Sequence, residues 1–114
     1  MKLGAVERKF AELVWEHAPL GSGELVKLCE QELNWKKPTT YTVLRKLCQR
    51  GLFENVGGVV TVVQTREAYF AQQGRELVDD AFGGSLPSFV AAFTQGNKLT
   101  PEEAAEIRKL IEGM

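Results

Sequence analysis

The sequence has few of the residues that mark catalytic, metal-binding or secreted proteins. It contains two cysteines and one histidine, and neither a CxxC nor an HExxH spacing occurs. Cys29 and Cys48 fall where helical patterns place apolar residues, so we expect buried reduced thiols rather than a disulfide or a metal pair. P-loop, GxSxG and nucleophile–base spacings are missing too. We therefore expect no enzyme activity, no metal and no cofactor.

Long apolar runs are also missing. No run approaches the ~20 residues that span a bilayer, and the N-terminus lacks the apolar segment of a secretion signal. We therefore expect a cytoplasmic protein without membrane insertion. With 114 residues and 44% hydrophobic composition, the chain can bury one ordinary core or form two small subdomains.

Acidic residues are missing from one segment, between Trp35 and Gly51. This segment carries five basic residues, although the formal net charge of the whole chain is −1: Lys36, Lys37, Arg45, Lys46 and Arg50. Residues 1–58 have nine Lys/Arg against seven Asp/Glu, whereas residues 59–114 have five against eight. The basic character is therefore local, and it indicates an anionic partner for the N-terminal half. A pI near 5.9 argues against indiscriminate coating of nucleic acid, because non-specific affinity comes mainly from phosphate neutralisation.

The same segment predicts a helix that starts at Pro38 and stops at Gly51. At 100° per residue, one side is suited to the core: Tyr41, Leu44, Leu47 and Cys48. The opposite side is small, polar and basic: Thr39, Thr42, Val43, Lys46, Gln49 and Arg50. Such a face can enter the DNA major groove, read base edges and hold phosphates. A solvated basic helix is the alternative interpretation.

Two further helices are predicted before the basic helix. An apolar stripe indicates the first, over about residues 5–17: Val6, Phe10, Leu13 and Val14. Ser22 is a candidate N-cap for the second, which runs to about Leu33. This second helix and the basic helix that follows it are joined by a tight turn. Two helices joined in this way, with a basic face on the later one, form a helix-turn-helix arrangement.

The residues after the basic helix predict a β-hairpin. Two β-rich runs, residues 52–56 and 59–64, flank the pair Gly57-Gly58. Three helices followed by a hairpin form a winged helix, and a buried strand of another α+β domain is the alternative. Asn55 is the only strongly polar residue near the tip, so we expect little more than backbone contacts from the wing.

The C-terminal half predicts three short amphipathic helices. One runs from Thr65 to the pair Gly83-Gly84, one from Ser85 to about Thr94, and one opens at Thr100 with Pro and Glu in capping-box positions. Because helices this short cannot bury their apolar stripes alone, we expect a homodimer. We assign the dimer contacts to nine residues: Leu77, Val78, Phe82, Phe89, Val90, Phe93, Ile107, Leu110 and Ile111. The fold class is thus mainly α (α+β), with a winged-helix DNA-binding domain over residues 1–65 and a dimerisation region over residues 66–114.

The opening LGAVERKFAELVWE, the segment TTYTVLRKL and the tail LTPEEAAEIRKLIE resemble the penicillinase-repressor family, the BlaI/MecI/CopY group of bacterial regulators. The resemblance covers nearly the whole chain. It implies a dimeric winged-helix repressor that binds palindromic operators, with Thr39, Thr42 and Lys46 reading DNA. We place Arg45 and Arg50 on phosphates and include Lys36, Lys37 and Tyr41 in the DNA-binding set.

The resemblance also implies regulation by cleavage in the β-lactam branch, through a membrane-bound sensor metalloprotease. The scissile bond would be Ala92–Phe93, where that branch has Asn in place of Ala92. Packing in a dimer core is the alternative role of this segment. The copper branch ends in a cysteine-rich metal hook, whereas no cysteine follows Cys48 here.

Two other functions stay open. A winged helix with a basic face can bind an acidic protein, and salt-sensitive binding to a palindromic duplex but not a scrambled one would separate the two. A small-molecule sensor is the third possibility, with a pocket lined by four phenylalanines: Phe70, Phe82, Phe89 and Phe93.

Overall fold

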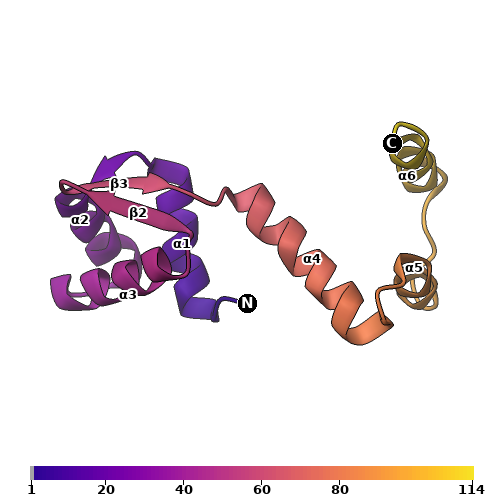
Figure 1. Cartoon of the computed structure of the whole chain (residues 1–114), viewed down its shortest axis with the longest axis horizontal. Helices are drawn as coiled ribbons and strands as arrows, with labels where there is room; N and C mark the ends of the chain where they lie inside the picture. The colour runs from indigo at the N-terminus through magenta and orange to yellow at the C-terminus, as the bar shows by residue number, and fades with distance from the viewer. Residues whose placement is uncertain (1) are drawn as a thin grey trace. The chain divides into compact units, whose positions relative to one another are not determined.

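The computed structural model describes residues 2–114 and confirms the mainly α winged-helix fold. The elements follow one another along the chain (Figure 1) as α1 (Ala5–His17), β1 (Leu20–Gly21), α2 (Ser22–Leu33), α3 (Lys37–Gln49), β2 (Phe53–Val56), β3 (Val59–Val62), α4 (Arg66–Phe82), α5 (Leu86–Thr94) and α6 (Pro101–Glu112). The chain divides into two compact units, which we call the N-terminal unit (Met1–Gln73) and the C-terminal unit (Gly74–Met114). None of the helices within residues 2–114 has the length and apolar character needed to cross a membrane.

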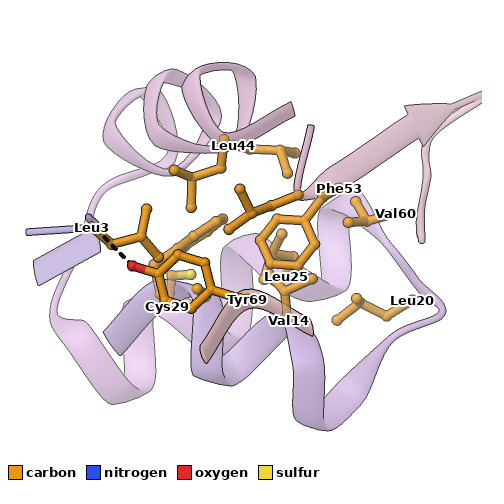
Figure 2. Packing of buried hydrophobic residues seen from close by; sticks show 13 residues of the cluster. Leu3, Val14, Leu20, Leu25, Cys29, Leu44, Phe53, Val60 and Tyr69 are labelled. Carbon is orange, nitrogen blue, oxygen red and sulfur yellow. Dashed lines mark hydrogen bonds between the residues drawn. The ribbon is translucent and has the colours of Figure 1, made fainter. Parts of the chain in front are cut away.

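The hydrophobic core lies in the N-terminal unit, between the three helices and the sheet (Figure 2). Phe10 and Val14 of α1, Leu25 of α2, Leu47 of α3 and Phe53 of β2 are all fully buried. The predicted inward side of α3 is confirmed, with Leu44 and Leu47 buried and Tyr41 and Cys48 packed against the core. Trp35, in the connection before α3, stacks on Phe10 with ring centroids 5.6 Å apart.

The sheet has three antiparallel strands in the order β1-β3-β2. The predicted hairpin is β2–β3, with Phe53 opposite Val62 and Val56 opposite Val59. Gly57 and Gly58 turn the chain at φ 59° and 80°, a conformation that favours glycine. The sequence interpretation missed β1, which pairs Leu20 with Val60, because a two-residue strand is too short to show alternation.

Three local predictions for the helices were wrong. Val6 is 57% exposed because Ala11, rather than Val6, completes the buried stripe of α1. Ser22 is the first residue of α2 rather than its N-cap, which is Gly21, and its hydroxyl accepts a hydrogen bond from Tyr41. On α3, Val43 is half-buried against the core, and Thr40 is buried although it was not assigned to the core side.

The first turns of α4 belong to the N-terminal unit. Tyr69 is buried, and its hydroxyl accepts a hydrogen bond from the backbone N–H of Leu3 at 2.8 Å. The Trp15 indole N–H donates to the carbonyl of Gln64 at 3.0 Å. The division between the two compact units therefore falls after Gln73, whereas the predicted functional boundary lies at residue 65.

The C-terminal unit has well-defined helix ends and little burial. Ser85 caps α5 through a hydrogen bond from the N–H of Ser88. The capping box predicted for α6 is present, because Thr100 and Glu103 each accept a hydrogen bond from the other's backbone N–H. No residue of α5 or α6 is buried.

Candidate nucleic-acid interface

The candidate interface is the outer face of α3, which the packing of its inner face leaves exposed. Residues on this face come from one helical arc opposite Leu44 and Leu47. The helix begins at Lys37, one residue before the predicted start at Pro38, and Lys36 is its N-cap. The exposed residues of the segment are Lys36, Lys37, Pro38, Thr39, Thr42, Arg45, Lys46 and Gln49.

The side chains at the centre of this face are short and polar. Thr39 and Thr42 are both exposed, and the Thr42 hydroxyl donates to the carbonyl of Pro38 at 2.9 Å. This bond fixes the rotamer and leaves the lone pairs of the hydroxyl oxygen available as acceptors. The face can therefore approach another surface closely, with Thr42 held in one orientation.

The predicted DNA-binding residues are not all equally available. Arg45 is exposed, whereas Tyr41 is half-buried and its hydroxyl donates to Ser22 at 3.1 Å, which ties α3 to α2. Arg50 is half-buried beyond the end of α3. The structure thus places Tyr41 and Arg50 at the edges of the face rather than at its centre.

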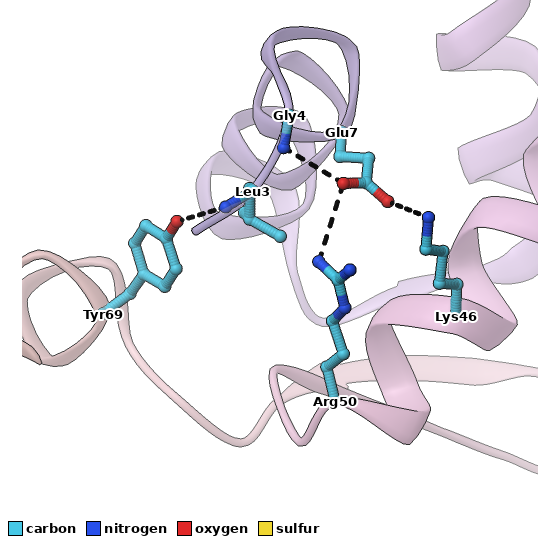
Figure 3. Close-up of polar contacts among 6 residues, drawn as sticks. All are labelled: Leu3, Gly4, Glu7, Lys46, Arg50 and Tyr69. Carbon is cyan, nitrogen blue, oxygen red and sulfur yellow. Dashed lines mark hydrogen bonds and ion pairs between the residues drawn. The ribbon is translucent and has the colours of Figure 1, made fainter. Parts of the chain in front are cut away.

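Lys46 and Arg50 share a partner on α1. The Glu7 carboxylate lies 2.8 Å from the Lys46 ammonium and 3.6 Å from the Arg50 guanidinium (Figure 3). The sequence interpretation missed Glu7, although its position three residues after Gly4, at the start of a predicted helix, could have indicated a capping role. The basic face of α3 therefore includes a carboxylate contributed by another helix.

The electrostatic environment keeps Glu7 charged. The hydrogen bond from Lys46, followed by the backbone N–H of Gly4, lowers the pKa of the Glu7 carboxyl. The carboxylate is also at the N-terminus of α1, where the helix dipole favours negative charge. Glu7 is therefore a permanent anion at neutral pH.

The two cysteines lie behind this face rather than on it. Cys29 is buried and Cys48 is half-buried, and both are free thiols. Burial raises the pKa of each thiol, which disfavours the reactive thiolate form. Among residues 2–114, no group of three or more His, Cys, Asp or Glu side chains is arranged to hold a metal ion.

The four phenylalanines of the sensor hypothesis lie in different surroundings. The Phe70 ring has the Arg8 and Arg66 guanidinium carbons 4.9 and 4.8 Å from its centroid. Phe82 packs edge-on to Phe89, and Phe89 contacts Phe93 at 6.1 Å between centroids. Phe89 and Phe93 line a small hollow with Val90, Thr94, Leu99 and Ile107.

The predicted dimer residues are partly or fully exposed in the single chain. Val78, Phe82 and Phe89 are half-buried within the C-terminal unit. The other six expose 40% or more of their surface: Leu77, Val90, Phe93, Ile107, Leu110 and Ile111. A concentration of exposed apolar side chains of this kind is characteristic of a protein interface.

Comparison with known proteins gives two matches. The model of the penicillinase repressor family matches residues 3–113. A penicillinase repressor from Bacillus licheniformis is 21% identical over 115 residues, which cover 97% of this chain and 90% of that protein. Both matches extend over the winged helix and the C-terminal unit together.

Proposed function

This chain belongs to the penicillinase repressor family and is a transcriptional repressor, and from that premise we propose that it acts as a homodimer that binds palindromic operator DNA through α3. The observation that carries the proposal is the outer face of α3. This face carries exposed hydroxyls and cations, and α3 itself contributes no acidic residue to it. The inner side of α3 packs on the core that α1 and α2 help to form. This is the geometry in which a recognition helix enters the major groove.

The roles of the side chains follow from their positions. Thr39 and Thr42 have short side chains, which let the helix come close enough for their hydroxyls to contact base edges. The ammonium of Lys46 can donate to guanine acceptors in the major groove. Arg45, Lys36 and Lys37 lie around this centre and bind phosphates, which sets affinity and register. Arg50 contributes to the same phosphate-binding edge, and Tyr41 supports the helix from its inner side.

The C-terminal unit supplies the dimer contacts. Its helices are locally capped, yet α5 and α6 have no buried residue, so the apolar side chains gain a core only when a second copy covers them. A two-fold dimer presents two copies of α3 to two half-sites of a palindrome. We assign DNA binding to residues 1–65 and dimerisation to residues 66–114, with the first turns of α4 joining the two functions.

Proteolytic induction is the regulatory part of the proposal. The Ala92–Phe93 bond lies in α5, and both residues are exposed in the single chain. Cleavage would separate Phe93 from Phe89 and detach α6, which weakens the dimer. A membrane-bound sensor metalloprotease would need a locally opened state, because a helical bond is a poor substrate.

Cleavage is tested in producing cells treated with a β-lactam, with chain length followed by mass spectrometry. Fragments that end at Ala92 are the expected result. A chain that stays intact while its target genes are switched on would exclude the mechanism. It would leave packing as the role of this segment.

Operator binding is tested by selecting duplexes from a randomised pool with the full-length protein. We expect an enriched palindrome, salt-sensitive binding to it, and much weaker binding to the same duplex after scrambling. Retention of all duplexes alike, or of none, would favour a winged helix that binds an acidic protein. Sedimentation of the free protein, with a dimer as the expected result, checks the assembly separately.

A further inference from the structure

Glu7 occupies an unusual position for an acidic residue, because it lies against the cations of the proposed DNA-binding face. Its Oε1 accepts a hydrogen bond from the backbone N–H of Gly4 at 3.0 Å and lies 3.6 Å from Nη1 of Arg50. Its Oε2 lies 2.8 Å from Nζ of Lys46. Figure 3 shows the carboxylate between these three groups.

The carboxylate is the fixed member of this cluster. The hydrogen bond from the Gly4 N–H attaches it to the N-terminus of α1, and the Glu7 side chain is only 18% exposed. Lys46 is the mobile member, because its side chain is 54% exposed on a flexible four-carbon stem. The exposed fraction of the Arg50 side chain, 26%, is intermediate between those of Glu7 and Lys46. When α3 meets an external anion, Lys46 can leave Glu7 while Nη1 of Arg50 stays beside the carboxylate and leaves its other nitrogens for phosphate.

We propose that Glu7 is an internal counter-anion of the DNA-binding face, which competes with DNA for Lys46 and so limits the affinity of the protein for duplex DNA. The inference rests on the proposed function of α3 as the recognition helix. In a complex that uses Lys46, DNA and Glu7 compete for the charge of the same ammonium group. Glu7 is a positioning residue in this scheme, because it acts on DNA through Lys46 and does not itself contact DNA.

A physical reason favours competition over simple orientation of Lys46. A carboxylate beside the recognition helix repels phosphate directly, and it also neutralises one of the positive charges that would otherwise release counterions from DNA. The Lys46 ammonium has three N–H donors, so it can keep its 2.8 Å contact with Glu7 while it donates to DNA, but the carboxylate still offsets its charge.

The test compares Glu7→Gln with Glu12→Gln in the full-length protein. Glutamine keeps an acceptor oxygen for the Gly4 N–H, so α1 should remain intact. Glu12 is on the same helix and pairs with Arg66 rather than with α3, at 2.6 Å, so its substitution makes the same charge change at another place. Melting temperature, measured for both variants, reports on the fold.

Two probes are used: a duplex of arbitrary sequence and a heparin column. We expect Glu7→Gln to bind the duplex roughly twofold to fivefold more tightly than the wild type, the range that loss of a competing ion pair allows. The dependence of log K on log salt should become steeper by up to about one unit. Glu7→Gln should also elute from heparin at higher salt than Glu12→Gln.

A second substitution identifies the cation. In a Lys46→Gln background, Glu7→Gln should lose most of its effect on both probes. An unchanged effect there, equal shifts for Glu7→Gln and Glu12→Gln, or weaker binding by Glu7→Gln would each overturn the proposal. If the wild type and Glu7→Gln bind no duplex while the heparin shift persists, the proposed DNA-binding function fails, and the role of Glu7 as a limit on duplex affinity fails with it.

Discussion

The N-terminal and C-terminal units use similar helices but differ in what those helices bury. In the N-terminal unit, thirteen apolar side chains from all its elements close on one another. In the C-terminal unit, α5 and α6 have equally clear helix ends, yet no residue in them is buried. The comparison teaches that capping and periodicity specify a helix, whereas a core needs enough elements to enclose it. The N-terminal unit has enough elements within one chain to enclose its core.

The largest expected difference comes from matched substitutions of phenylalanine. Phe10→Ala removes a fully buried ring that stacks on Trp35, so the N-terminal unit should lose about 3–5 kcal/mol of unfolding free energy. Phe93→Ala removes a ring that is 54% exposed, so it should change the stability of the dilute monomer little and weaken the dimer instead. Urea denaturation at low and high protein concentration measures both effects. A Phe93→Ala variant as unstable as Phe10→Ala at low concentration would contradict this comparison.

Deletion of residues 85–114 should break the dimer and keep the N-terminal unit. This unit contains every buried residue between residues 2 and 114, so the shortened chain should fold and sediment as a monomer. Its affinity for the selected operator should fall by about 100-fold, since one half-site supplies only part of the contacts. Sedimentation and operator titration are the measurements. A shortened chain that still dimerises would place the interface elsewhere.

The sequence predicted the regular elements well and the contacts between distant segments poorly. Helix ends with their own signals, such as Thr100 and Glu103 of α6, were confirmed, because capping depends on neighbours in the chain. The strand Leu20–Gly21 and the burial of Thr40 depend on what packs against them, which no local pattern records. The same reason explains Glu7: its pairing with Lys46 joins residues of two helices that only the tertiary fold brings together.

Lys46→Ala should act on DNA binding without affecting the core of the N-terminal unit. If Lys46 contacts a base, operator affinity should fall by about 1–3 kcal/mol and the base preference at one position should relax. The side chain is 54% exposed, so stability and dimerisation should stay as in the wild type. Titration of the operator and of single-base variants measures the effect. Unchanged operator affinity would remove Lys46 from the interface.

Arg45→Ala should produce a smaller and less selective loss. Arg45 is exposed beside the centre of the α3 face, and we expect it to bind phosphate rather than a base edge. Affinity for all duplexes should fall alike, and the salt slope should decrease by about one unit. Titrations at several salt concentrations, with operator and scrambled duplex, provide the measurement. A loss confined to the operator would instead assign Arg45 to base reading.

The smallest effect concerns pH, and it should involve the N-terminal unit. Hydrogen bonds from Lys46 and from Arg66 lower the pKa of Glu7 and of Glu12 below the ordinary value of 4.5. In the pH range where these carboxyls titrate, the unfolded chain therefore binds more protons than the folded chain. The stabilisation from the two carboxylates is present above about pH 4.5 and is lost as the pH falls further. For Glu7 the loss should stay below about 1 kcal/mol. Unfolding curves from pH 6 downward, with Glu7→Gln as the flatter comparison, measure it.

Tyr69 has a consequence for the order in which a newly made chain acquires structure. It is the last buried residue in the part of the chain that the structure describes, and it closes the core by bonding to Leu3 near the other end. A growing polypeptide cannot complete this core until Tyr69 has left the ribosome, and α5 and α6 emerge from the ribosome only afterwards. The N-terminal unit can thus fold before the helices that hold the proposed dimer contacts are free to meet a partner.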